Sequence, residues 1–206
     1  MGAEAREMLQ AERADFRQFV ATLTVEEWAA PTLCADWTVR DVVAHVVGPP
    51  DVSALLRRAP GAVAHFGRQM DRANADRVGQ FAGMSKEQIL AAYDASKRVE
   101  RPYVQVLTDK LIHHQDIRRP LGHPRIVPAE RVEASLRRVI ASRWIFGGRA
   151  RVDGLRIEAT DIHFEHGVGP TVTGSGEALL LALAGRRVAL DDLDGEGLAL
   201  LRSRIA

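Results

Sequence analysis

Apolar residues recur at helical spacing through the first two-thirds of this chain. Within residues 3–23 they fall at Leu9, Phe16, Val20 and Leu23, which are seven, four and three positions apart. That spacing places them on one face of an α-helix, because a helix completes a turn about every 3.6 residues. A face of this kind must be covered by other elements, so the pattern predicts several amphipathic helices around a shared core.

Three helix-start signals support this prediction. A hydroxyl side chain followed three residues later by an acidic or amide side chain can cap the free N–H groups of a new helix. The pairs are Thr24 with Glu27, Thr38 with Asp41, and Ser85 with Gln88. Further helices are expected over residues 51–58, 61–78, 103–118 and 129–145, the last with a buried stripe that includes Trp144.

The spacing of apolar residues changes from helical to strand-like at Gly147 and Gly148. Residues 155–159 alternate like a half-buried strand, and two more short strands are expected at 163–166 and 171–173. A helix follows Ser175, residues 188–190 are expected to return to the sheet, and a last helix begins near Asp194. The predicted fold class is mainly α. It comprises a helical bundle over residues 1–147 and a small α+β domain over residues 148–206.

Composition excludes several classes of protein. The 206 residues include 28 basic and 27 acidic ones, a net charge of +1, which argues against a general nucleic-acid surface. No apolar run approaches the ~18–20 residues of a transmembrane helix, and the first residues lack the apolar core of a signal peptide. Cys34 is the only cysteine, so no internal disulfide can form. We expect a cytoplasmic protein with neither a nucleic-acid nor a membrane partner.

Three residues form a candidate metal site. Asp109 and His113 are four positions apart, so on a helix both side chains leave one face on adjacent turns. His45 lies in a separate helical segment, on the flank of its apolar stripe. Two imidazoles and one carboxylate match the ligand set of a catalytic zinc that keeps one position open. Each histidine taken alone would more simply be a polar residue in a core.

The surroundings of His113 add further candidates. Apolar residues border both faces of the 103–118 helix, so we expect it to be buried nearly all round, with its polar face lining an internal cleft. Asp116 either orients an imidazole or forms an ion pair with Arg118 or Arg119 at the helix end. The two arginines either hold a carboxylate substrate or polar cofactor, or complement the helix dipole. His114 points about 100° away from His113 and is expected to be structural or exposed.

Four stretches together resemble a known family. They are residues 37–45, 109–113, 113–122 and 179–186. The chain is similar along nearly its whole length to the actinobacterial maleylpyruvate isomerase family of mycothiol-dependent enzymes, within the DinB-like superfamily. The resemblance implies an up-down four-helix bundle followed by a small C-terminal domain.

The resemblance also implies a ligand set. A divalent metal, usually zinc, would be held by His45, by His113 and by the residue four positions before His113. The family has Glu at that last position and this chain has Asp109. Asp is one methylene shorter, so the helix must approach the metal more closely or a water must bridge. We assign Asp116 and Arg118 as catalytic candidates and Arg119 as a cofactor-binding candidate.

The implied activity is isomerisation of maleylpyruvate with mycothiol as cofactor, or S-transfer to another small electrophile. Zinc would keep a bound thiol deprotonated. Cys34 is a poor candidate for that thiol because it lies in a loop before the His45 helix, so an exogenous thiol is expected. Two alternatives remain: a non-catalytic metal- or ligand-binding module, active in stress response or interaction, and a metal-assisted hydrolase. A His-Glu-x-x-His motif, typical of such hydrolases, does not accompany the site. Either a monomer or a homodimer is compatible with the sequence.

Overall fold

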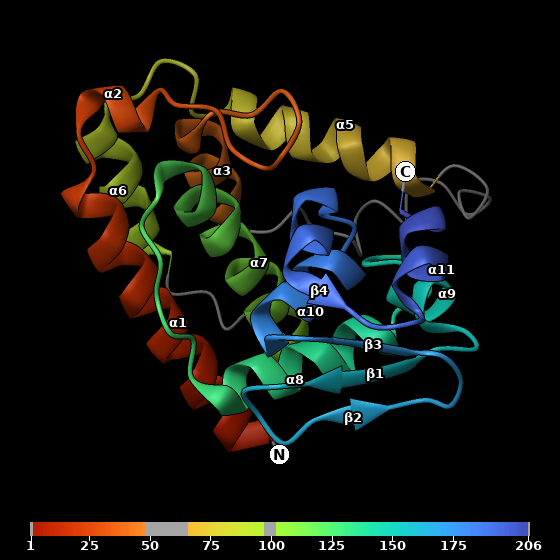
Figure 1. Cartoon of the computed structure of the whole chain (residues 1–206). Helices are drawn as coiled ribbons and strands as arrows, with labels where there is room; N and C mark the ends of the chain where they lie inside the picture. Colours follow the sequence, from red (N-terminus) through yellow and green to blue (C-terminus); the bar gives the residue numbers. More distant parts are fainter. Residues whose placement is uncertain (1, 48–65, 97–101, 206) are drawn as a thin grey trace. The chain divides into compact units, whose positions relative to one another are not determined.

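The computed structural model describes residues 2–47, 66–96 and 102–205 (Figure 1). They divide into two compact units, here named by their content. The bundle unit comprises residues 10–100 and 113–124, and the sheet unit comprises residues 1–9, 101–112 and 125–206. Helices α1 (Gly2–Thr22) and α7 (Tyr103–Leu121) each contribute to both units. The sequence predicts two independently folding domains, residues 1–147 and 148–206. That division stays a prediction.

The described residues of the bundle unit form helices joined by loops. Besides its parts of α1 and α7, it contains α2 (Val25–Trp28), α3 (Val39–Val46), α5 (Phe66–Gly79) and α6 (Lys86–Ala95). The expected segment 51–58 lies outside the described residues, and the helix expected over 61–78 is described from Phe66 onward.

All three predicted capping pairs are confirmed. Thr24, Thr38 and Ser85 each accept a hydrogen bond from the backbone N–H three residues later. The side chain of that later residue in turn accepts a hydrogen bond from the backbone N–H of the capping residue. Each reciprocal pair satisfies two N–H groups that a helix start leaves without an intrahelical acceptor. The helix starts of α2, α3 and α6 are thus encoded locally.

The core of the bundle unit is built from the apolar stripes of its helices. Val39, Val42 and Val43 of α3 are fully buried, and α3 contacts α2, α5 and α6. The other buried members are Phe16, Phe19, Val20, Leu23, Trp28, Ala44, Val46, Val47, Phe81, Ile89, Leu90, Tyr93 and Ile117. The stripe predicted for residues 3–23 is therefore confirmed, and it fixes which face of α1 is covered.

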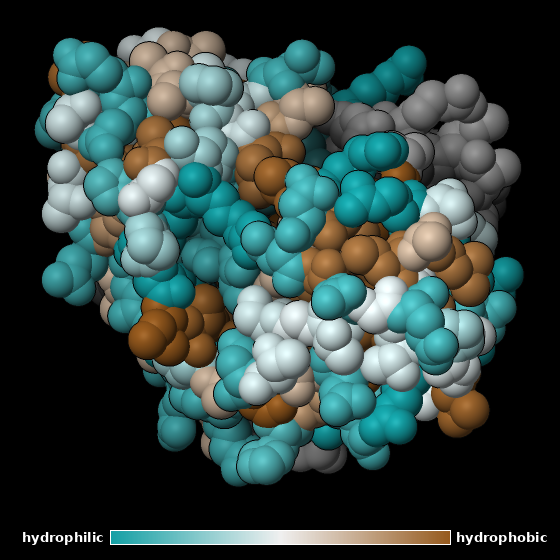
Figure 2. Space-filling view, viewed as in Figure 1, coloured by the Kyte–Doolittle hydropathy of each residue, from teal (hydrophilic) through white to brown (hydrophobic). Residues whose placement is uncertain are grey.

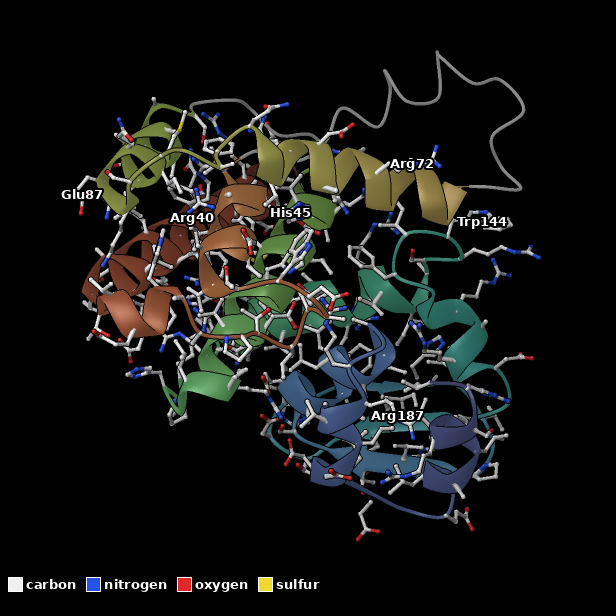
Figure 3. All side chains as sticks on the ribbon, turned by 90° about the horizontal axis from the view of Figure 1, so that it is seen from above. Arg40, His45, Arg72, Glu87, Trp144 and Arg187 are labelled. Carbon is white, nitrogen blue, oxygen red and sulfur yellow. The ribbon has the colours of Figure 1, made fainter. Side chains whose placement is uncertain are left out.

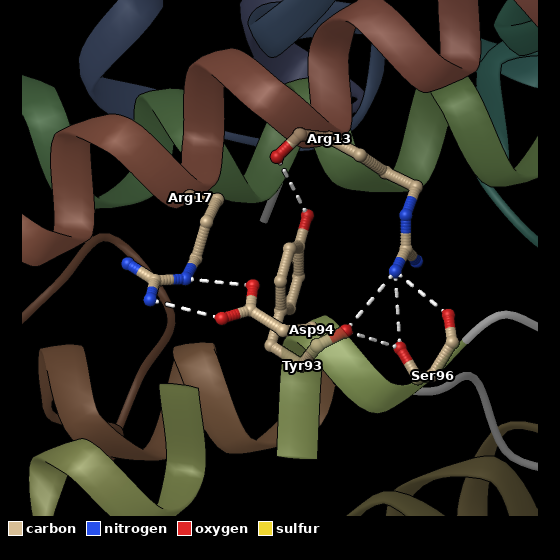
Figure 4. Close-up of polar contacts among 5 residues, drawn as sticks. All are labelled: Arg13, Arg17, Tyr93, Asp94 and Ser96. Atoms are coloured by element: carbon tan, nitrogen blue, oxygen red, sulfur yellow. Dashed lines mark hydrogen bonds and ion pairs between the residues drawn. The ribbon is translucent and has the colours of Figure 1, made fainter. Parts of the chain in front are cut away.

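Polar contacts join α1 to α6 within the same unit (Figure 4). The Arg13 guanidinium donates to the carbonyl oxygens of Tyr93 and Ser96 at 3.2 and 2.8 Å, and the Tyr93 hydroxyl donates back to the Arg13 carbonyl at 3.1 Å. Arg17 and Asp94 form a two-pronged ion pair at 2.8 and 3.0 Å. These contacts fix the end of α6 against α1, although the exposed Arg17 pair adds little stability.

The sheet unit holds four short strands in the order β2-β1-β3-β4. Strand β1 (Arg156–Ala159) is parallel to β3 (Thr171–Gly174), while β2 (Glu165–His166) and β4 (Leu193–Asp194) are antiparallel edge strands. The three strands predicted at 155–173 are confirmed. Gly169, with φ of 139°, lets the chain cross from β2 to β3, because a Cβ there would lie 2.2 Å from the Gly154 carbonyl oxygen.

Five helical segments complete the sheet unit beside its parts of α1 and α7 (Figure 1). They are α8 (Ala129–Ile140), α9 (Gly148–Val152), α10 (Gly176–Leu183), the 3-10 helix η2 (Arg187–Asp192) and α11 (Leu198–Ser203). Helix α10 is apolar and buried apart from Glu177 in its first turn. It contacts α8, β1 and β3, so it forms the centre of this core. The predicted mainly α class with a small α+β part is confirmed.

Three local predictions in the sheet unit are wrong. The last helix begins at Leu198 and not near Asp194, because Leu193 and Asp194 pair with β3 as strand β4. Residues 188–190 form part of η2 rather than a strand, because the apolar residues Ala189 and Leu190 are buried by a helical turn instead of by alternation. Helix α8 ends at Ile140, so Trp144 lies beyond its buried stripe and is 61% exposed. The chain turns at Ser142, whose hydroxyl accepts a hydrogen bond from the Phe146 N–H.

The visible surface is mixed. Figure 2 shows hydrophilic residues on every part of this face, with the hydrophobic ones in several separate groups. Among the described residues, no helix combines the length and the apolar character needed to cross a bilayer.

Candidate metal centre

Helix α7 buries an unusual number of polar side chains. The prediction of a helix buried nearly all round is confirmed, since residues 106–117 are buried except for the half-buried Asp109. The buried polar members are Thr108, Lys110, His113, His114, Gln115 and Asp116. Buried polar groups are stable only with partners, so the contacts of this face are informative.

His45 and His113 face each other within the bundle unit. Their ring centroids are 4.8 Å apart in an edge-to-face arrangement, and the two residues are 4% and 9% exposed. The Thr38 cap fixes the start of α3, which places His45 two turns later near its C-terminal end. Figure 3 shows His45 pointing inward from α3, whereas Glu87 projects from the edge of the same unit. The half-buried Trp37 ring lies 5.2 Å from His45 and 6.4 Å from His113.

Asp109 lies one turn before His113 on the continuous helix α7. One ligand atom from each of His45, Asp109 and His113 lies within 4.8 Å of the others. The structure therefore brings together the three residues that the sequence predicts as metal ligands. The donor set of two imidazoles and one carboxylate fits a divalent cation. Whether His113 can bind through Nε2 depends on which ring nitrogen carries the proton.

Asp116 determines the chemistry of the His113 ring. Its Oδ2 lies 2.9 Å from Nδ1 of His113, and its side chain is fully buried. An ionised carboxylate is only an acceptor, so Nδ1 carries the proton and donates it. The Nε2 lone pair is then available to a cation, which is the arrangement that metal-binding histidines use. The sequence left two roles open for Asp116, orienting an imidazole or pairing with Arg118 or Arg119, and this contact favours the first.

Pro120 provides an anchor for the loop that precedes α3. It lies inside α7 and has no backbone N–H, so the carbonyl of Asp116, four residues earlier, receives no intrahelical bond from it. That carbonyl accepts instead from the Leu33 N–H at 3.0 Å. Thr32 closes the same loop through its hydroxyl, which donates to the Trp37 carbonyl at 3.0 Å. The loop over residues 31–37 is therefore held against the Asp116 turn of α7.

Pro120→Ala is expected to loosen this loop without unfolding the protein. The new N–H would compete with Leu33 for the Asp116 carbonyl, so hydrogen exchange of the Leu33 amide should accelerate by about tenfold, which corresponds to ~1.4 kcal/mol of lost local protection. The Val39 amide, which donates to Ala30 at 2.9 Å, is the internal control and should keep its rate. Unchanged exchange at Leu33 would contradict this role of Pro120.

Cys34 lies beside His113, a neighbourhood that its loop position in the sequence did not indicate. Its half-buried Sγ lies 3.0 Å from Oδ2 of Asp116 and 3.5 Å from Nδ1 of His113. Cys34, His113 and Asp116 thus form a second group of potential ligands that shares His113 with the first. Pro120, four residues after Asp116, is the sequence signal for this contact, because it leaves the Asp116 carbonyl without an intrahelical donor.

Arg118 leaves α7 about 140° away from His113 around the helix axis. Its Nε donates to Nε2 of His114 at 2.8 Å, its Nη1 donates to the His123 carbonyl at 3.0 Å, and its guanidinium lies 3.7 Å above the Phe19 ring. Nδ1 of His114 contacts Oε1 of the fully buried Glu12 at 2.7 Å. These contacts give Arg118 and His114 a place in a buried network, while Arg119 is half-buried near the helix end.

The end of this network is more exposed. Nε2 of His123 lies 2.6 Å from Oε1 of Glu27. A hydrogen bond from His123 lowers the pKa of the Glu27 carboxyl, and the Thr24 N–H of the capping pair lowers it further. Because both side chains are partly exposed to solvent, the pair contributes mainly to local order.

The N-terminal half of the chain matches a family model. Residues 9–102 match the mycothiol maleylpyruvate isomerase N-terminal domain. This match confirms the family resemblance over a segment that includes Trp37 and His45. No curated protein matches the sequence.

Two solved structures are similar to nearly the whole chain. One is the mycothiol-dependent maleylpyruvate isomerase, with a TM-score of 0.59, and the other is a histidine-to-alanine mutant of that enzyme, with a TM-score of 0.60. In both cases the identity is 13%, and the match covers 95% of this chain and 93% of the other. The likeness confirms the fold, a helical bundle with a small α+β part.

Proposed function

We propose that this protein is a divalent-metal enzyme that uses a low-molecular-weight thiol, mycothiol, on a small electrophilic substrate. The observation that carries the proposal is the convergence of His45, Asp109 and His113, with Asp116 bonded to Nδ1 of His113. The match of residues 9–102 to the mycothiol maleylpyruvate isomerase N-terminal domain supports the choice of thiol and reaction class. The reaction class is isomerisation, as in maleylpyruvate isomerase, or S-transfer.

His45, Asp109 and His113 would hold the cation, with zinc the preferred ion. A bound zinc supplies the positive charge that keeps a coordinated thiol deprotonated at neutral pH. Three protein ligands are typical of catalytic sites, because a fourth position then remains for a small molecule. Asp109 in place of the family's Glu preserves an oxygen donor, although its shorter side chain reduces reach.

The neighbouring side chains would orient and shield this centre. Asp116 holds the proton on Nδ1 of His113 and so fixes the tautomer in which Nε2 carries the lone pair. The Trp37 ring lies against both imidazoles and would restrict water on that side. Arg119 remains our candidate for a contact with the acidic groups of cofactor or substrate. For Arg118 we propose a packing role, because its guanidinium is engaged with His114, His123 and Phe19.

The proposal is tested by following free thiol and substrate together. Purified protein with zinc and mycothiol is offered maleylpyruvate and other electron-poor alkenes or epoxides. Isomerisation changes the substrate at constant free thiol, whereas S-transfer consumes one thiol per product. Activity without any thiol would point instead to a metal-assisted hydrolase. No turnover of any electrophile, with metal bound, would point to a binding module and contradict the proposed enzyme.

Asp116→Asn is expected to weaken metal binding about 10–100-fold, the usual effect of removing a carboxylate partner from a metal-binding histidine. Asn keeps the size and one acceptor oxygen but loses the charge that holds the imidazole proton. Competition of zinc with a chelating dye measures the affinity, and Asp94→Asn on the exposed face of α6 is the matched control. Both substitutions are made in Cys34→Ser protein, so that the second group of potential ligands does not contribute. Wild-type affinity in Asp116→Asn would contradict the orienting role.

A further inference from the structure

A sulfur, an oxygen and a nitrogen atom that could each bind a cation lie together at the Nδ1 side of the His113 ring. Cys34 Sγ, Asp116 Oδ2 and His113 Nδ1 form a triangle with sides of 3.0, 2.9 and 3.5 Å. This group lies entirely within the bundle unit and includes neither His45 nor Asp109. A thiol, a carboxylate and an imidazole together are a ligand set for a thiophilic cation.

We propose that Cys34, Asp116 and His113 Nδ1 form a second cation site, selective for thiophilic divalent metals such as zinc or cadmium. Around a tetrahedral zinc with bonds of ~2.0–2.3 Å, ligand atoms are about 3.3–3.6 Å apart. Two sides of the observed triangle must therefore lengthen by a few tenths of an ångström, and the third already fits. The short sides are the hydrogen bonds that the cation would replace.

The local structure holds these ligands in place. The Cys34 N–H donates to the Thr32 hydroxyl at 3.1 Å, and the Cys34 carbonyl accepts from the Trp37 N–H at 3.1 Å. The adjacent Leu33 N–H donates to the Asp116 carbonyl, so the Cys34 turn is tied to the turn of α7 that supplies the other ligands. Asp116 and His113 are buried whereas Cys34 is half-buried, which leaves an approach on the sulfur side.

The charge and proton balance of this site is simple. The Cys34 S–H bond breaks, its proton leaves to solvent, and the thiolate binds the cation through sulfur. The His113 proton moves from Nδ1 to Nε2, which frees the Nδ1 lone pair. One proton is released per cation and nothing is oxidised or reduced. The thiolate and the Asp116 carboxylate together neutralise the two positive charges.

The two sites would exclude each other. The centre formed with His45 and Asp109 would use the Nε2 lone pair of His113, whereas the Cys34 site uses Nδ1. A neutral imidazole has only one lone pair on nitrogen, so it can serve one cation at a time. Excess thiophilic metal would therefore inhibit the enzyme. This competition rests on the proposed function, but the existence of the Cys34 site does not.

Cadmium tests the site directly, because a cadmium–thiolate bond absorbs in the ultraviolet. Chelator-treated wild-type protein and His45→Ala should both gain this absorbance and saturate at one cadmium per chain. Cys34→Ser should lose the absorbance, and Asp116→Asn and His113→Ala should need at least about tenfold more cadmium, equivalent to ~1.4 kcal/mol.

Two outcomes would overturn the proposal. One is no absorbance in the wild type at stoichiometric cadmium. The other is equal cadmium affinity in wild type, Asp116→Asn and His113→Ala, which would mean that the thiol binds alone. Circular dichroism and thermal unfolding of each variant establish that it is folded before titration. Because His45→Ala removes a ligand of the first centre only, its cadmium absorbance separates failure of this proposal from failure of the proposed function.

Discussion

Replacing Glu12 with Ala is expected to lower the free energy of unfolding by about 1–3 kcal/mol, the range for leaving a buried hydrogen-bond donor without its acceptor. Glu12 is fully buried, and its carboxylate lies 2.7 Å from Nδ1 of the equally buried His114. Arg118 donates to Nε2 of His114 at 2.8 Å, so the imidazole must carry its proton on Nδ1 and donate it to Glu12. The neutral ring thereby links a carboxylate to a guanidinium.

Removing the carboxylate leaves a buried N–H without this acceptor and Arg118 without its counter-charge. Chemical denaturation measures the loss, and Arg17→Ala on the same helix is the matched control. The Arg17–Asp94 pair is exposed, so its loss is expected to lower stability by less than ~1 kcal/mol. Combining Glu12→Ala with His114→Ala should give less than the sum of the two single effects, because the residues act together. A loss in Glu12→Ala no larger than that of the control would contradict this account of the network.

His45→Ala is expected to reduce thiol-dependent kcat/KM by at least about a hundredfold. A bound metal contributes several kcal/mol of charge stabilisation, and every 1.36 kcal/mol corresponds to about a tenfold change in rate. His45 comes from α3 whereas Asp109 and His113 share α7, so its removal leaves two ligands on one helix. Such a pair would hold zinc much more weakly than three ligands do.

The measurement is the initial rate with mycothiol at a fixed zinc concentration, together with thermal unfolding to establish that the variant is folded. His163→Ala in the sheet unit is the control, since His163 is exposed and belongs to neither ligand group. Its rate should equal that of the wild type. A His45→Ala enzyme that is folded, and still as fast as this control, would contradict the role of His45.

Features encoded locally could be predicted from the sequence. The capping pairs at Thr24, Thr38 and Ser85 position three helix starts through side chains only three residues apart. The four-residue spacing of Asp109 and His113 likewise follows from the helical period alone. The stripe of α1 and the strands β1 and β3 were predictable for the same reason. The convergence of His45 with this pair was expected from the combination of ligand types and from the family resemblance.

Features that depend on contacts between distant segments could not be predicted in the same way. Cys34 lies next to Asp116 because Pro120 leaves a carbonyl that binds the Leu33 N–H, and no local periodicity encodes that contact. Arg118 and Glu12 are similarly joined through His114, across about a hundred residues of sequence. Residues 188–190 were wrongly predicted as a strand because a short apolar run fits a strand and a helical turn equally well.

The metal content of purified protein tests the central claim most directly. Elemental analysis of the wild type, His45→Ala, Asp109→Ala and His113→Ala, each dialysed against the same low zinc concentration, gives the stoichiometry. The three substitutions are also made in Cys34→Ser protein, so that the second cation site does not obscure the result. We predict one tightly held divalent ion per chain in the wild type and in Cys34→Ser, and a loss of most of it when any of the three substitutions is added to Cys34→Ser. Equal metal content in Cys34→Ser and the three double variants, each shown to be folded, would contradict the assignment of His45, Asp109 and His113 as ligands.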